Sequence, residues 1–97
     1  MFNQVMNAVA EKLVALRLKN FRRLLNERAN GNQTEFGRMI HKRQSYVSDM
    51  LAGKKAFGEK VARDIELKLG LEPYWLDREQ DGEETIQGLM QIGRAHV

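Results

Sequence analysis

Apolar residues recur three and four positions apart along most of the chain, and no segment alternates apolar and polar residues with a period of two. The first spacing gathers apolar side chains on one face of an α-helix, whereas a half-buried strand needs the second. Periodic segments lie at residues 3–29, 33–40, 44–51 and 58–69, and a short turn follows near residue 73. The sequence therefore predicts an all-α fold of about five helices.

Residues that favour helix ends separate these segments. Gly31 suits the left-handed conformation after the first helix, and Asn32 is predicted to cap the second helix with Glu35 as its reciprocal partner. The first helix is predicted either as one long rod or as two pieces that meet near Leu16. Pro73 is expected near the first position of the last turn. Three residues after it are expected to pack back onto the core: Tyr74, Trp75 and Leu76.

Charge is distributed unevenly along the 97 residues, which are enough for one domain. Residues 16–71 carry 13 Lys and Arg against six Asp and Glu, a net charge of +7. Residues 72–97 carry a net charge of −4, and residues 1–15 are neutral. A basic body suits a polyanionic partner such as DNA, because Lys and Arg displace counterions from phosphates. The alternative is that these charges only solvate a helical surface.

Several function classes lack support in the sequence. The chain has no cysteine, and His41 and His96 have no partners at metal-ligand spacing, so no metal and no other cofactor is expected. Neither a nucleophile–base arrangement nor a glycine-rich phosphate loop is apparent, so the protein is not expected to be an enzyme. No bilayer-length apolar run or secretory signal is visible, which predicts a cytoplasmic protein without membrane association.

Residues 33–51 carry the pattern of a helix-turn-helix. Two short helices are separated by a three-residue turn, residues 41–43, and the second helix has a polar outer face. The helices must cross closely, which requires a small residue at the contact, and Gly37 occupies that position. Four apolar residues would form the wedge that fixes the crossing angle: Phe36, Ile40, Val47 and Met50.

Residues 32–53, NQTEFGRMIHKRQSYVSDMLAG, resemble the Cro and lambda-repressor-like helix-turn-helix family. The match continues into RLKNFRRLL at residues 17–25 and IELKLGLEPYWLD at residues 65–77, so about 60 of the 97 residues are covered. The strongest matches are Gln33, Phe36-Gly37, Val47-Ser48 and Gly53. The chain departs from the family at the turn: His41 and Lys42 replace a glycine and an apolar residue, and Arg43 replaces a Ser or Thr cap. The resemblance implies a lambda-repressor-like bundle with an extra or extended N-terminal helix.

The resemblance also implies a recognition helix, residues 44–51, that reads the major groove of double-stranded DNA from its N-terminal end. Residues implied to face base edges are Gln44, Ser45 and Tyr46, with Ser48 and Asp49 further along. Residues implied to contact the phosphate backbone are Gln33, with the free amides at the start of its helix, and Arg43, Lys54 and Lys55. Tyr46 has an alternative role, packing against the first helix.

The chain divides into three predicted parts. Residues 16–77 form the DNA-binding domain, residues 1–15 an N-terminal helical extension, and residues 78–97 an acidic linker or tail. An apolar stripe on the extension predicts a surface for homodimerisation or docking; alternatively, the natural chain starts at Met6 or later. Residues 92–97, IGRAHV, match the translation of a common sequencing-library adapter. The hypothesis is that the natural gene continues and encodes a missing C-terminal domain.

Two functions from different classes follow. The first is a sequence-specific transcriptional regulator, a phage-type repressor or Cro-like protein, that binds operator DNA as a dimer. The alternative is an antitoxin of the same fold that binds a toxin protein and its own promoter. RNA binding is less favoured, because no exposed face is predicted to carry aromatic residues for base stacking.

Overall fold

The computed structural model describes residues 2–80, and their side chains from residue 9 onward. This part of the chain contains no strand; its elements are α1 (Phe2–Ala29), α2 (Gln33–Met39), α3 (Gln44–Leu51), α4 (Glu59–Leu69) and the 3-10 helix η1 (Trp75–Asp77). The predicted all-α fold with an extended N-terminal helix is confirmed. None of the helices in residues 2–80 combines the length and apolarity that crossing a membrane requires. The proposed adapter-derived segment, residues 92–97, lies outside the described residues.

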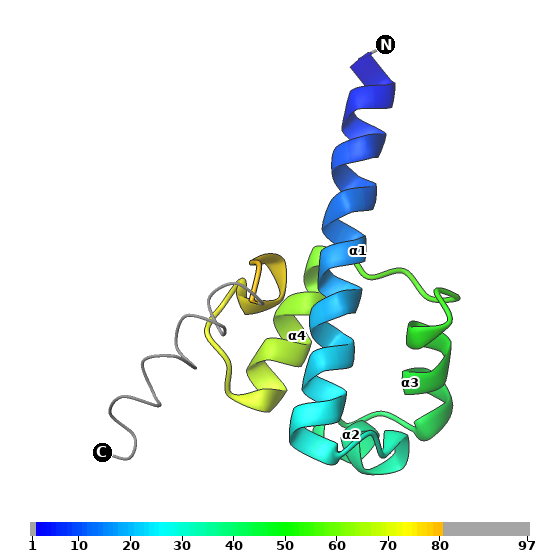
Figure 1. Cartoon of the computed structure of the whole chain (residues 1–97), viewed down its shortest axis with the longest axis vertical. Helices are drawn as coiled ribbons and strands as arrows, with labels where there is room; N and C mark the ends of the chain where they lie inside the picture. The colour runs from blue at the N-terminus through cyan, green and yellow to red at the C-terminus, as the bar shows by residue number, and fades with distance from the viewer. Residues whose placement is uncertain (1, 81–97) are drawn as a thin grey trace.

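The first helix is one continuous rod, which decides between the two alternatives left open by the sequence. In Figure 1 the N-terminal half of α1 projects beyond the other helices, while its C-terminal half lies among them. Val9 is 59% exposed and Val14 is 38% exposed, whereas the face that begins at Arg17 is buried. The extension therefore presents apolar side chains that nothing in the described chain covers.

The core joins the C-terminal half of α1 to the three shorter helices. Phe21 is fully buried, and its ring makes edge-to-face contacts with Phe36 on α2, at a centroid distance of 5.2 Å, and with Phe57, at 5.7 Å. The other buried apolar side chains are Leu24, Leu25, Ala29, Ile40, Val47, Met50, Ala62, Ile65 and Leu76. α1 therefore acts as the support on which the helix-turn-helix and α4 are assembled.

Four charged residues on α1, α4 and η1 form a cluster of ion pairs, Arg17, Arg63, Glu66 and Asp77, which sequence analysis did not predict. Arg17 is 4% exposed; its Nε and Nη2 donate to the Asp77 carboxylate at 2.7 and 3.0 Å, and its Nη1 donates to the Phe57 carbonyl at 2.9 Å. Arg63 bonds both Asp77 and Glu66. The hydrogen bond from Arg17, with that from Arg63, holds the pKa of Asp77 below its usual range. The cluster thus ties the end of the fold to α1.

The segment around η1 corrects one prediction in part. Leu76 is fully buried and Trp75 is half-buried, as expected, but Tyr74 is 50% exposed. Tyr74 has a φ of 71° as the residue before η1, and its ring lies against the Arg63 guanidinium, with Cζ 4.1 Å from the ring centroid. Pro73 lies in the turn that leads into η1, which the hydrogen bond from the Trp75 N–H to the Glu72 carbonyl closes at 3.1 Å, as the expected place near the start of the last turn requires.

Packing against α1 continues past η1. The Asn20 amide, which is 1% exposed, donates to the carbonyls of Leu76 and Arg78 at 2.9 and 2.8 Å. Gln80 is 8% exposed and donates to the Trp75 carbonyl. Residues 78–80 are therefore part of the packed body that supports the helix-turn-helix.

Candidate nucleic-acid interface

A polar cap sets the start of α2. The Asn32 side chain accepts a hydrogen bond from the Glu35 backbone N–H at 2.9 Å, as predicted for an N-cap residue. The predicted reciprocal bond is absent from the described interactions: the Glu35 carboxylate pairs with Arg38 at 2.8 Å, and the Asn32 N–H donates to the Ala29 carbonyl. The capping box is therefore half formed, which is sufficient to fix where Gln33 begins the helix.

The turn between α2 and α3 works without the family's glycine. His41 takes the left-handed conformation with a φ of 61°, which histidine tolerates better than most residues. The Lys42 N–H donates to the Gly37 carbonyl at 2.7 Å, and this bond closes the end of α2. Arg43 occupies the N-cap position of α3 with extended backbone, but its side chain makes no capping hydrogen bond. α3 begins at Gln44, as predicted.

Gly37 lies against the backbone of the turn that connects α2 to α3. A Cβ at this position would lie 2.6 Å from the Lys42 carbonyl oxygen and 3.3 Å from the Arg43 carbonyl group. The predicted wedge is confirmed, since four side chains beside Gly37 are at most 1% exposed: Phe36, Ile40, Val47 and Met50. This contact sets the angle between α2 and α3, and with it the side of α3 that faces outward.

The outward start of α3 carries a pair of glutamines. Gln44 and Ser45 are exposed, and the Gln44 Nε2 donates to the Oε1 of Gln33 at 2.6 Å. Gln33 comes from the start of α2, so this bond joins the two helices at their N-terminal ends. Further along α3, Ser48 and Asp49 are half-buried. The bond leaves the Gln44 Oε1 and one Nε2 hydrogen available to a ligand.

Tyr46 lies on another side of α3. Successive helical residues are rotated by about 100°, so Tyr46 is roughly opposite Gln44. It is half-buried, packs against the core, and lines a hollow of about 250 Å³ with Lys60, Val61 and Asp64 of α4. Burial, and secondly the negative charge of Asp64, raises the pKa of Tyr46. The predicted alternative was packing against α1; the ring packs against the core to which α1 contributes, and it also lies beside α4.

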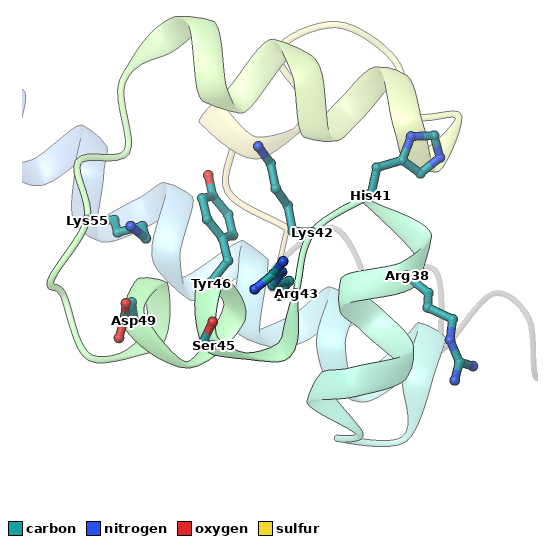
Figure 2. Close-up of a pocket in the computed structure, with 8 residues that line it drawn as sticks. All are labelled: Arg38, His41, Lys42, Arg43, Ser45, Tyr46, Asp49 and Lys55. Carbon is teal, nitrogen blue, oxygen red and sulfur yellow. The ribbon is translucent and has the colours of Figure 1, made fainter.

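Positive side chains gather beside α3. A pocket of about 440 Å³ is open to solvent there, and Figure 2 shows the side chains that line it. Five of them were singled out from the sequence: Arg43, Ser45, Tyr46, Asp49 and Lys55. Three were not: Arg38, His41 and Lys42. With four Lys or Arg side chains against one carboxylate, the pocket suits an anionic ligand.

A family model described as helix-turn-helix matches residues 21–76, more than half of the chain. The chain belongs to the helix-turn-helix family. This is a family of DNA-binding regulators and not of enzymes. The matched residues include α2, the turn, α3 and α4, and therefore the outward glutamines and the basic pocket.

One solved structure resembles this helix-turn-helix protein and comes from a phage. The chain is similar to a chain in the crystal structure of the Rep-Ant complex from a Salmonella temperate phage, with a TM-score of 0.68 and 25% sequence identity. The match covers 73% of this chain and 42% of the other, so this chain spans less than half of that protein's length. A comparison with curated protein sequences gave no match.

Most of the predicted DNA-contacting residues of this helix-turn-helix protein fall into two groups, and two residues belong to neither. Gln33 and Gln44 meet at the N-terminal ends of α2 and α3, and the other group lines the basic pocket. Ser48 lies on α3 and Lys54 in the loop after it, and neither lines the pocket. Of the missed residues, His41 and Lys42 lie in the turn and Arg38 lies near the end of α2; the basic run His41-Lys42-Arg43 was the signal that could have indicated the first two.

Proposed function

We propose that this protein is a sequence-specific transcriptional regulator of the phage-repressor or Cro type, which places α3 in the major groove of operator DNA. The observation that carries the proposal is the hydrogen bond between exposed Gln44 and half-buried Gln33 at the N-terminal ends of the two helices. The similarity to a chain of a phage protein complex supports the phage-type assignment of this regulator.

The chemistry of Gln44 suits adenine. Its Oε1 can accept from the adenine N6 amino group while its remaining Nε2 hydrogen donates to N7, the two-pronged pairing open to glutamine in the major groove. The bond to Gln33 restricts the rotamers of Gln44 before DNA arrives, which lowers the entropy lost on binding. The amide hydrogens of Gln33 remain able to donate to a phosphate oxygen.

The remaining contacts follow from position. Ser45 and Ser48 can donate to or accept from base edges, and Asp49 can accept from the cytosine amino group. Arg43 and Lys54 are exposed at the two ends of α3, where they would contact phosphates. The phosphate contacts orient the protein on any sequence, whereas the base contacts, that of Gln44 above all, distinguish one base pair from another.

Substitution of Gln44 should therefore differ in kind from substitution of Lys54. Gln44→Ala should relax the base preference at one position by about 1–3 kcal/mol. Lys54→Ala should weaken binding to all sequences equally and lower the slope of log affinity against log salt concentration by about 1. The measurement is competition binding of duplexes that differ at single positions, at a fixed salt concentration. An unchanged preferred sequence in Gln44→Ala would show that Gln44 does not read a base.

We also propose that the regulator binds DNA as a homodimer paired along the projecting half of α1. The exposed Val9 and Val14, with half-buried Leu13, support this assignment. A projecting helix gains little stability by itself in water, and packing its apolar face against a second copy would stabilise it. Paired domains bind half-sites about one helical turn apart, or a multiple of it, so the spacing of half-sites in the preferred DNA tests the dimer.

A further inference from the structure

Two lysines from different loops lie against the ring of Tyr46. The Nζ of Lys42, in the turn before α3, is 4.9 Å from the ring centroid, and the Nζ of Lys55, in the loop after α3, is 5.5 Å from it. Figure 2 shows Lys42 and Lys55 on opposite sides of Tyr46. Both distances fall within the range at which an ammonium is attracted to an aromatic ring. The ring thus restrains two cations that the chain separates by twelve residues.

The ring itself has little freedom to move. Tyr46 is half-buried and packs against the core, its free side borders the hollow beside α4, and Figure 2 shows its hydroxyl directed toward α4. The ring is directed toward α4 and away from the side of α3 that carries Gln44, which favours a positioning role over base reading.

The cations beside the ring lack internal partners. Among residues 9–80, no carboxylate lies within salt-bridge distance of Lys42, Arg43 or Lys55. Other charged groups nearby are engaged: Arg38 pairs with Glu35, and Asp64 pairs with Lys68 at 2.8 Å. Asp49 contributes one carboxylate to the same pocket. Asp64 also interacts electrostatically with Lys42, but within residues 9–80 the pocket itself holds more cations than carboxylates, which favours an anionic ligand.

We propose that Lys42 and Lys55, held by the Tyr46 ring, form a phosphate-binding pocket beside α3, and that Tyr46 is a positioning residue. The ligand is a phosphate of the DNA backbone, so the inference rests on the proposed function. Gln33 contacts one side of α3 and this pocket lies on the other side, as a helix between two phosphate backbones requires. The pocket adds Lys42 to the interface and reassigns Tyr46.

The test measures the salt dependence of binding to a duplex of fixed sequence, by titration at several salt concentrations. Lys42→Ala and Lys55→Ala should each lower the slope of log affinity against log salt concentration by about 0.9, the value for one phosphate contact. Tyr46→Leu should weaken binding roughly 5- to 10-fold, since two ring–cation contacts are lost, whereas Tyr46→Phe should stay within about 2-fold. Lys19→Ala, an exposed lysine on the packed half of α1 that pairs with Glu79, is the matched control and should leave the slope unchanged.

A positioning role is distinguished from a structural one by coupling between the variants. Lys42→Ala should cost less affinity in the Tyr46→Leu background than in the wild type, and Tyr46→Phe should restore the wild-type difference. If Tyr46→Leu does not fold, the two exposed lysines still decide the matter through their slopes. Wild-type slopes in both lysine variants would overturn the pocket and leave the proposed function standing. Failure of the wild type to bind any duplex would overturn both.

Discussion

Replacing Glu66 by alanine is expected to lower the free energy of unfolding by about 3–5 kcal/mol, the usual cost of removing one partner from a buried ion pair. Total stabilities of such domains are about 5–15 kcal/mol, so the variant should be close to unfolding. Urea denaturation followed by circular dichroism measures the difference.

The size of this effect follows from how many groups share one carboxylate. Glu66 is 1% exposed, and its two oxygens accept from Arg63 at 2.8 and 3.0 Å. They also accept from the backbone N–H groups of Tyr74, at 2.9 Å, and Leu76, at 2.8 Å. Alanine would leave both N–H groups without a partner, and a buried unsatisfied donor costs about 1–3 kcal/mol.

A matched control separates burial from charge. Glu72 is 78% exposed at its side chain and pairs with Arg78 at 3.1 Å on the surface. Glu72→Ala should change stability by less than about 1 kcal/mol, because exposed ion pairs contribute little. Equal effects of Glu66→Ala and Glu72→Ala would show that the cluster around Arg63 does not hold the end of the fold.

Replacing Gly37 by alanine should destabilise the fold, against the usual gain of about 1 kcal/mol when alanine replaces glycine within a helix. The added Cβ would lie 2.6 Å from the Lys42 carbonyl oxygen, and backbone cannot rotate away as a side chain can. Overpacking of this kind costs about 1–3 kcal/mol, and Gly37→Val should cost more than Gly37→Ala. The free energy of DNA binding should be reduced by more than the free energy of unfolding, because the displaced turn would also separate Gln44 from Gln33.

The control for Gly37 is Gly58. A Cβ on Gly58 would meet nothing within 4 Å, and its φ of −80° suits alanine, so Gly58→Ala should cost less than about 1 kcal/mol. Thermal unfolding and DNA binding are measured on both variants. A Gly37→Ala protein as stable as the wild type, with unchanged affinity, would mean that α2 and α3 do not depend on this close contact.

Local signals in the sequence predicted the helices well. The bounds of α3 agree with the prediction, and α4 starts one residue late because Gly58 serves as its cap. α2 ends at Met39 because Ile40 is its C-terminal cap, although Ile40 is buried as expected. Caps, glycines and apolar spacing act over three or four residues, which is why a single sequence reveals them.

Partners that are distant in sequence could not be predicted in the same way. Arg17 and Asp77 are sixty residues apart, and in a helical pattern a lone charged residue is typical of a solvent-facing position. Glu66 and Asn20 were also overlooked, because a polar residue in a helical pattern usually faces solvent, whereas both are 1% exposed. Tyr74 was expected in the core because it is aromatic, but its backbone conformation turns the ring outward onto Arg63.

In the candidate interface, too, the residues with local signals were predicted and the contacts between distant segments were not. Gln33, Gln44 and Gly37 were singled out because their spacing fits a known local arrangement. The pocket beside α3 joins a turn, a helix and a loop, so Lys42 had no local signal beyond its basic neighbours. The roles of Gln33, Gln44 and Lys42 in DNA binding are predictions that binding experiments test.

Selection of bound duplexes from a random DNA pool, at a stated fixed salt concentration, tests the central claim most directly. The account predicts enrichment of one sequence, made of two symmetric half-sites about one helical turn apart, with an adenine at the position that Gln44→Ala relaxes. A recovered pool as random as the starting pool, with binding that depends only on salt, would contradict it.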